Sequence, residues 1–168
     1  MNPPDITIHN ETVIVLTFSN PEQCNGLITQ YEIEIVDLHG FVFKYNFTLN
    51  EINNNNGLKQ VVINKLIPNT HYSIFIRAYN SIGPGILSSA SDIKMPYGAP
   101  PIPNPPTISI IGKNHITLNI ELVSDIYGPI TNYQIRVNHI SDNSNYIGYS
   151  GSETDNIVIN DLVLFDNY

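Results

Sequence analysis

The residues of this sequence that could bind a metal or perform catalysis are few and lie far apart. Zinc and iron sites use His and Cys ligands at short, paired spacings, but the chain has a single cysteine, Cys24. Its five histidines are scattered, at His9, His39, His71, His115 and His139. No Gly-x-Ser-x-Gly nucleophile motif, phosphate-binding loop or Gly-x-Gly-x-x-Gly motif occurs. We therefore expect no metal site, no cofactor and no catalytic residue, so the chain is not predicted to be an enzyme.

One pair of carboxylates has a spacing that could serve acid-base chemistry. Glu32 and Glu34 alternate with apolar residues and therefore share one face of a predicted strand. Acid-base catalysis needs two carboxyl groups with different pKa values. We expect this face to be exposed to solvent, where nothing separates the two pKa values. The predicted role is a cross-strand pair with Arg77 that contributes well under ~1 kcal/mol at a surface.

The composition excludes some classes of partner. Seven Lys and Arg against fifteen Asp and Glu give a net charge of -8, which repels nucleic acid and anionic membrane surfaces. Hydrophobic residues make up 42% of the 168 residues, enough to bury a core. A lone cysteine excludes an intramolecular disulfide framework but does not identify the redox compartment.

The ends of the chain and its apolar runs bear on targeting. The first ten residues, MNPPDITIHN, contain no apolar run, so no signal peptide is predicted in this segment. No stretch of 18 consecutive apolar residues occurs, so we expect no direct membrane insertion within the segment.

The sequence contains an internal repeat. At an offset of 102 residues, NGLITQYEIEI (25–35) aligns with YGPITNYQIRV (127–137), and Ile14, Leu16 and Phe18 align with Ile116, Leu118 and Ile120. At an offset of 96, VVINKLIPNTHY (61–72) aligns with IVINDLVLFDNY (157–168). The chain thus holds two copies of one unit. The second copy stops at Tyr168, the counterpart of Tyr72, so we expect a fragment or a truncated product that lacks the last two strands of its second unit.

The hydrophobic periodicity is that of β-strands. Apolar and polar residues alternate in 31–36 and 72–79, turn residues separate such runs, and no run has a sustained helical pattern. This predicts an all-β sandwich with about seven short strands per unit, and a surface loop at the Asn tract 53–56. The Tyr72 hydroxyl is expected to bond backbone just upstream and so hold a corner between sheets. The predicted core comprises Phe18, Tyr31, Ile33, Leu66, Tyr72, Ile74 and Ile76.

Several motifs together resemble a known family. The pattern Leu-x-Pro-x-Thr-x-Tyr, followed by Ala-x-Asn, Gly-x-Gly and Ser, is similar to that of fibronectin type III domains. A Trp usual in the second strand of that family is absent, and Phe18 stands in its place. In this sequence the matching residues are Leu66, Pro68, Thr70, Tyr72, Ala78, Asn80, Gly83, Gly85 and Ser88.

The resemblance implies an immunoglobulin-like β-sandwich and a domain organisation. Residues 1–96 would form a complete domain, and 106–168 would form a partial one. The Pro-rich residues 97–105 between them are expected to be a semi-rigid linker. A Pro-x-x-Pro motif at Pro100 and Pro103 offers the weaker alternative of a recognition site.

The resemblance also implies a function. Tandem domains of this kind occur in the extracellular regions of cell-surface adhesion molecules and receptors, so we expect a non-catalytic protein-binding or spacer module at the cell surface. The partners would be other proteins and further domains of the same chain. Two alternatives remain open: accessory spacer domains of a larger secreted enzyme, and repeats of an intracellular muscle-type giant protein.

Two features could serve such a module. The predicted outer face of one strand carries Phe75, Arg77 and Tyr79 at alternate positions, and aromatic residues with Arg are enriched at interface centres. The alternative is that neighbouring side chains such as Gln30 cover this face.

Asn10 and Asn46 begin glycosylation sequons, as in a membrane glycoprotein. A chain this rich in Asn, Ser and Thr contains such triplets by chance, so they are compatible with secretion without indicating it.

Overall fold

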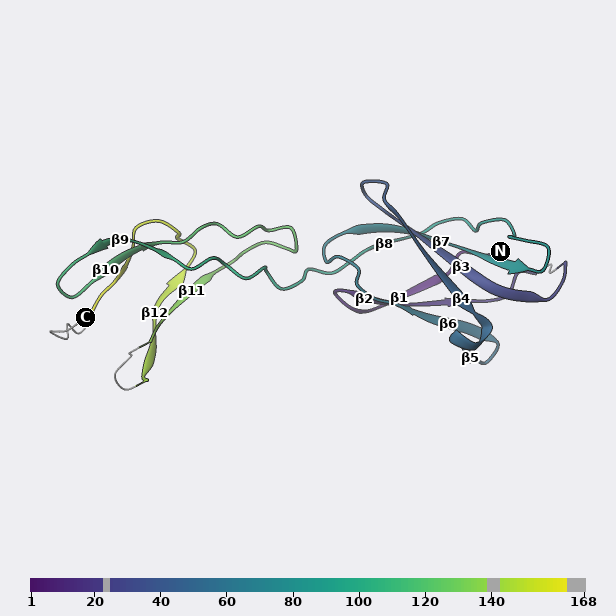
Figure 1. Ribbon diagram of the computed structural model, residues 1–168, viewed down its shortest axis with the longest axis horizontal. Helices are drawn as coiled ribbons and strands as arrows, with labels where there is room; N and C mark the ends of the chain where they lie inside the picture. Colours follow the sequence, from purple (N-terminus) through teal and green to yellow (C-terminus); the bar gives the residue numbers. More distant parts are fainter. Residues whose placement is uncertain (23–24, 139–142, 163–168) are drawn as a thin grey trace. The chain divides into compact units, whose positions relative to one another are not determined.

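Strands dominate the protein, and they form two separate units. The computed structural model describes residues 1–22, 25–138 and 143–162. The chain divides into a first unit, Met1–Gly98, and a second unit, Ala99–Tyr168 (Figure 1). The one helical segment among the described residues is the short 3-10 helix η1 (Leu49–Glu51). The all-β fold class predicted from the periodicity is confirmed.

The first unit consists of two four-stranded antiparallel sheets. One sheet has the order β1 (Asp5–Asn10), β2 (Val13–Phe18), β6 (Leu58–Ile63) and β5 (Asn53–Asn55). The other has the order β4 (Val42–Thr48), β3 (Ile28–Asp37), β7 (His71–Asn80) and β8 (Ser91–Lys94). Their apolar faces pack on one another and enclose one core, which makes a β-sandwich.

The core of the first unit follows from the alternation of side chains along the strands. Inward-facing positions of β2, β3, β6 and β7 are buried, and outward-facing ones other than Glu32 are more exposed. The ring centroids of Phe18 and Tyr31 lie 5.0 Å apart, and the two rings are tilted by 58°. Each fully buried aliphatic or aromatic side chain contributes ~1.5–3 kcal/mol. The buried set includes Ile14, Leu16, Phe18, Tyr31, Ile33, Ile35, Val61, Ile63, Leu66, Tyr72, Ile74 and Ile76.

Tyr72 holds the corner that leads into β7. Its ring is buried, and its hydroxyl accepts a hydrogen bond from the Ile67 N–H at 3.0 Å. Thr70 tightens the same turn by donating from its hydroxyl to the Pro68 carbonyl at 3.1 Å. Its counterpart in the repeat, Tyr168, lies outside the described residues.

The described residues of the first unit form eight strands, one more than the predicted number of about seven. The extra strand, β5, arises from the Asn tract that was expected to be a loop. Asn56 and Gly57 both have positive φ, 50° and 82°, as a two-residue hairpin turn of type I′ requires. This turn places Asn55 opposite Leu58 and pairs the tract with β6.

The second unit has a smaller core. Its described strands form the sheet β13 (Ile157–Ile159), β10 (Ile116–Asn119) and β9 (Thr107–Ile111), and the hairpin β11 (Tyr133–Asn138) with β12 (Asn145–Gly151). The fully buried apolar residues among those described are Leu118, Ile157 and Ile159.

The sequence repeat is also a repeat of backbone pairing. Ile14 pairs with Ile63 in the first unit, and their counterparts Ile116 and Ile159 pair in the second. A hydrogen bond from the Leu66 N–H to the Thr12 carbonyl (3.0 Å) recurs from Leu162 to Asn114 at the same length. Lys65 and Asp161 share the left-handed conformation that precedes this bond, with φ of 64° and 60°. The two units therefore use one register at matched positions.

Candidate functional site

The first candidate surface is the outer face of the sheet β4-β3-β7-β8. The register places Glu32 opposite Arg77, Glu34 opposite Phe75, and Gln30 opposite Tyr79. On the other side of β3, Glu32 lies opposite Asn46 and Glu34 opposite Lys44. Side chains at directly opposed positions of adjacent strands lie within contact distance. Residues 30–34, 44–46 and 75–79 are thus brought together from three strands.

Glu32 is the centre of a charged network on this face. Arg77 Nη2 donates to Glu32 Oε1 at 2.5 Å, and the Tyr79 hydroxyl donates to Glu32 Oε2 at 2.9 Å. Lys44 Nζ lies 2.9 Å from Glu34 Oε2 and 3.7 Å from Glu32 Oε1. The Arg77 guanidinium also lies over the Tyr79 ring, 5.6 Å from its centroid.

The network changes the pKa of its members. Burial would raise the pKa of Glu32, but hydrogen bonds from Tyr79 and Arg77, with the charges of Arg77 and Lys44, together lower that pKa below its ordinary value. The hydrogen bond to Glu32 raises the pKa of Arg77. The pKa of Lys44 is raised, first by its hydrogen bond with Glu34. These shifts stabilise the charged forms, so the arrangement holds Glu32, Arg77 and Lys44 in their charged states.

The expectation that the Glu32 and Glu34 face is exposed is wrong for Glu32, which is only 6% exposed. Arg77, Tyr79 and Lys44 reach over its carboxylate from both neighbouring strands and remove it from water. The pairing with Arg77 is made by Glu32, whereas Glu34 pairs with Lys44. Phe75, Arg77 and Tyr79 are each half-buried on this outer face, beside these side chains.

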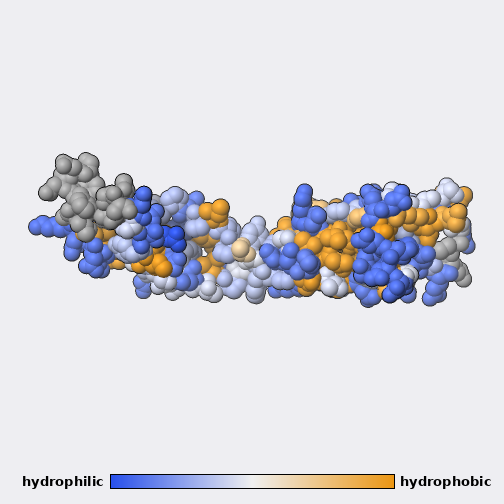
Figure 2. All heavy atoms as spheres, turned by 90° about the horizontal axis from the view of Figure 1, so that it is seen from below, coloured by the Kyte–Doolittle hydropathy of each residue, from blue (hydrophilic) through white to orange (hydrophobic). Residues whose placement is uncertain are grey.

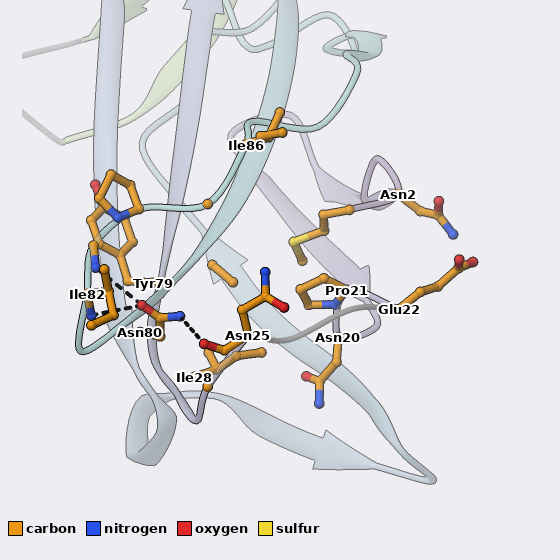
Figure 3. A pocket seen from close by; sticks show the side chains of 16 residues that line it. Asn2, Asn20, Pro21, Glu22, Asn25, Ile28, Tyr79, Asn80, Ile82 and Ile86 are labelled. Atoms are coloured by element: carbon orange, nitrogen blue, oxygen red, sulfur yellow. Dashed lines mark hydrogen bonds between the residues drawn. The ribbon is translucent and has the colours of Figure 1, made fainter.

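A second candidate surface is a cleft between loops at one end of the first unit (Figure 3). It has a volume of about 790 Å³ and is lined by parts of the segments 20–28 and 78–86 with the first two residues. Asn80 links the two loops, since its Nδ2 donates to the Asn25 carbonyl at 3.2 Å and its Oδ1 accepts the Ile82 N–H at 2.9 Å. Gly26, with φ of 139°, lies against Asn80, where a side chain would be strained.

The chemistry of this cleft is that of a binding surface. Asn side chains and apolar groups line most of it, together with the Glu22 carboxylate and Tyr79, and the described lining residues include no His, Cys, Ser, Lys or Arg. Ile82 and Ile86 at its rim are each 90% exposed. The sequence analysis missed this cleft; the Asn-Gly pair at 25–26 and the Gly-Pro-Gly turn at 83–85 mark its two loops but not their proximity.

Both sequon asparagines are exposed in the structure. Asn10 ends β1, and its Oδ1 accepts hydrogen bonds from the Thr12 N–H at 2.9 Å and the Thr12 hydroxyl at 3.1 Å. Asn46 lies on β4, on the same outer face as Glu32 and Arg77. The structure therefore places one sequon at a turn and the other beside the candidate partner surface.

Two further searches concern metals and membranes. No group of three or more His, Cys, Asp or Glu side chains that could hold a metal ion occurs within 1–22, 25–138 and 143–162. Over the same residues, no helix has the length and apolar character that crossing a membrane requires.

Comparisons with known proteins identify the fold family. Residues 2–94, more than half of the chain, match the family model of the fibronectin type III domain. No curated protein matches the chain at a significant level.

Among solved structures, the FN5 domain of Drosophila Lar is 26% identical, with 58% of this chain and 98% of that chain covered and a TM-score of 0.44. The FN1-FN3 domains of chicken CNTN1 are 20% identical, with 56% and 32% covered and a TM-score of 0.46. The 6th fibronectin type III domain of human fibronectin type III domain containing protein 3 is 20% identical, with 60% and 88% covered and a TM-score of 0.47. From the family match over residues 2–94, the chain belongs to the fibronectin type III domain family.

Proposed function

We propose that this chain is a non-catalytic protein-binding or spacer module in the extracellular region of a cell-surface adhesion molecule or receptor. Domains of this family are commonly protein-binding or spacer modules, and they are generally non-catalytic. Residues 1–96 and 106–168 act as successive domains in this proposal, with 97–105 as the linker. The observation that carries the binding role is the outer face of the first unit, where Phe75 and Tyr79 flank an Arg77 that is held in place by Glu32.

The rigidity of this face supports a role in binding. A side chain that is already fixed in the free protein loses little conformational entropy when a partner binds. Arg77 is fixed by Glu32 and by the Tyr79 ring, and Tyr79 is fixed by its own bond to Glu32. Aromatic and Arg side chains are the residue types that most often dominate binding energy. A partner would therefore contact Phe75 and Tyr79 as apolar anchors around a neutralised Arg77.

The candidate glycan at Asn46 bears on the same surface. Asn46 lies opposite Glu32 on β4, and Glu32 lies opposite Arg77 on β7, so the three side chains form one row across the face. Adjacent strands lie ~4.8 Å apart, which puts Asn46 about 10 Å from Arg77. A glycan at Asn46 would cover the partner surface, whereas one at Asn10 lies on a strand of the other sheet.

Binding to intact cells and to purified extracellular domains tests the partner surface. The 168-residue chain is tetramerised and compared with the variant Phe75→Ser, because Tyr79 also lines the cleft, and with Ile82→Ser/Ile86→Ser at the cleft rim. We expect the first variant to bind at least ~10-fold more weakly and the second to bind as the parent does. Loss of binding by the second variant alone would assign the partner to the cleft, and a parent chain that binds nothing would leave only the spacer role.

The location is tested separately. Cells that express the full-length protein are treated with a membrane-impermeant biotin reagent, and labelling of this segment is measured. Labelling of intact cells is the expected result, and labelling only after lysis would overturn an extracellular role. Chain secreted with Asn46→Gln is then compared with Asn10→Gln. If Asn46 carries a glycan, the Asn46→Gln chain should bind the partner more tightly and the Asn10→Gln chain should not.

A further inference from the structure

The two sheets of the first unit end in four edge strands, and three of these strands are poorly suited to pairing with a further strand. β5 has three residues and β8 has four, and the register between β1 and β2 shifts between Ile8 and Asn10. Short edge strands and bulges are devices that prevent edge-to-edge association. The fourth edge strand, β4, has seven residues that pair with β3 in an unbroken register, and no described strand pairs with its other side. β4 is therefore the edge at which another strand can add.

The inward face of β4 is aromatic and only partly covered. Phe43, Tyr45 and Phe47 point inward, since each lies opposite a buried residue of β3. Tyr45 and Phe47 pack against the core, whereas Phe43 is 45% exposed and Phe41, just before the strand, is 64% exposed. Figure 2 shows apolar surface, in orange, on both units. Apolar side chains beside an open strand edge allow an added strand to gain burial as well as backbone hydrogen bonds.

The single charge on β4 restricts the partner without closing the edge. Lys44 is the charged residue of the strand, and its Nζ lies 2.9 Å from Glu34 Oε2 of the same chain. A lysine on an edge strand opposes association when the added strand places a like charge directly opposite. A suitable partner strand therefore has a neutral or acidic residue opposite Lys44.

The sequence of β4 is complementary to itself. Tyr45 is the middle residue of Val42–Thr48, so antiparallel pairing about a two-fold axis at Tyr45 uses all seven residues of both copies. This register places Phe43 opposite Phe47 of the second copy and Tyr45 opposite its own counterpart. On the outer face it places Lys44 opposite the neutral Asn46. Aromatic pairs at directly opposed positions are favourable, and no like charges meet.

We propose that the open edge of β4 binds β4 of a second copy of this chain, so that the two sheets become one continuous sheet. The same axis brings Phe41 of one copy toward Leu49 of the other, and both residues are exposed in the single chain. This edge is distinct from the surface of Phe75, Arg77 and Tyr79, so the inference does not depend on the partner proposed for those residues. A glycan at Asn46 would stand where Lys44 of the second copy lies, so the test uses unglycosylated chain.

Sedimentation velocity of the 168-residue chain tests the proposal. A strand edge buries little area, so we expect a monomer–dimer equilibrium with a dissociation constant of roughly 10 µM to 1 mM. Because each copy has a net charge of -8, raising NaCl from about 50 to about 300 mM should strengthen the dimer. Amide exchange in 42–48 should slow as the chain concentration rises. Exchange in 58–63 should not change, since β6 is paired on both sides.

Variants of two exposed residues test the register. Asn46→Lys places a positive charge opposite Lys44 of the other copy and should weaken the dimer about tenfold, since the contact occurs twice. Within one chain the new side chain lies opposite Glu32, so the variant should fold as the parent does. Asn46→Gln keeps the position neutral and should dimerise as the parent does. Adding Lys44→Gln to Asn46→Lys removes the repulsion and should restore the dimer.

Four results would contradict the proposal. A chain that stays monomeric up to about 1 mM would overturn it. A dimer that Asn46→Lys leaves unchanged would use another surface, and failure of Lys44→Gln to restore the dimer would overturn the register about Tyr45. Slow exchange in 42–48 of a chain that stays monomeric would show that another segment of the same chain covers this edge.

Discussion

The guanidinium of Arg77 is joined to the carboxylate of Glu32 by a hydrogen bond of 2.5 Å between directly opposed positions of β7 and β3. Glu32 is almost fully buried, and Arg77 is half-buried. Removing one partner of such a pair leaves the other partly desolvated without its counter-charge, and this costs more than the pair itself contributes. The main effect of the pair is therefore not its own contribution to stability. It restricts which side chain β3 can carry opposite Arg77, because a side chain without a negative charge would leave Arg77 unpaired.

Substitution of Glu32 should destabilise the first unit more than substitution of its neighbour. We expect Glu32→Gln to lower the free energy of unfolding by ~1–3 kcal/mol, because Arg77 loses the carboxylate that neutralises it. The matched control Glu34→Gln removes a pair with the exposed Lys44 and should cost less than ~1 kcal/mol. Urea unfolding of both variants measures the difference, and equal costs would show that burial of Glu32 is unimportant.

The same carboxylate should make stability depend on acidity. Its pKa is lowered in the folded state, so the unfolded chain takes up the proton first and the folded state loses stability as the pH falls. The contribution is complete above the ordinary pKa of 4.5 and is lost as the pH falls through the lower folded value. The stability of the parent chain relative to Glu32→Gln, measured from pH 7 to pH 2, should therefore shrink below about pH 4.5. A difference that stayed constant over this range would contradict the lowered pKa.

The hydroxyl of Tyr72 should contribute measurably to stability. The change Tyr72→Phe keeps the buried ring but leaves the Ile67 N–H without its acceptor, at an expected cost of ~1–3 kcal/mol. Tyr97→Phe, in which the altered side chain is 61% exposed, is the control and should be nearly neutral. Thermal unfolding compares the two, and exchange of the Ile67 amide should be faster in Tyr72→Phe alone.

Gly148 should be a sensitive position of the second unit. A Cβ at this residue would lie 2.9 Å from Val137 Cγ2 and 3.0 Å from Ile159 Cγ2, closer than such atoms normally approach. We expect Gly148→Ala to cost ~1–3 kcal/mol, because it forces the hairpin β11-β12 away from β13. Asn145→Ala, at an exposed position of the same strand, is the control. Faster amide exchange at 157–159 with unchanged exchange in the first unit is the expected signature; equal exchange in both variants would show that the contact relaxes freely.

The fold was predictable from local patterns because alternate residues of a strand in a sandwich face the core, and these residues are apolar. The alternation predicts one apolar face with Tyr31, Ile33 and Ile35, and all three residues are buried in the structure. The repeat added a second line of inference, since matched residues such as Ile63 and Ile159 pair at matched positions. The tract at 53–56 was predicted wrongly because a polar composition was taken for a loop, whereas the Asn56-Gly57 turn forms a hairpin regardless of the side chains beside it.

The sequence by itself therefore determined the fold class, the family and the two repeated units, because each depends on residues close together in the chain or on one copy compared with the other. The tertiary structure alone decided which groups meet across the sheets and loops. Glu32 is buried by Arg77, which lies 45 residues away in sequence, and the cleft is linked by Asn80 and Asn25, 55 residues apart. A local pattern shows which way a side chain points, but burial and pKa depend on what other segments place over it.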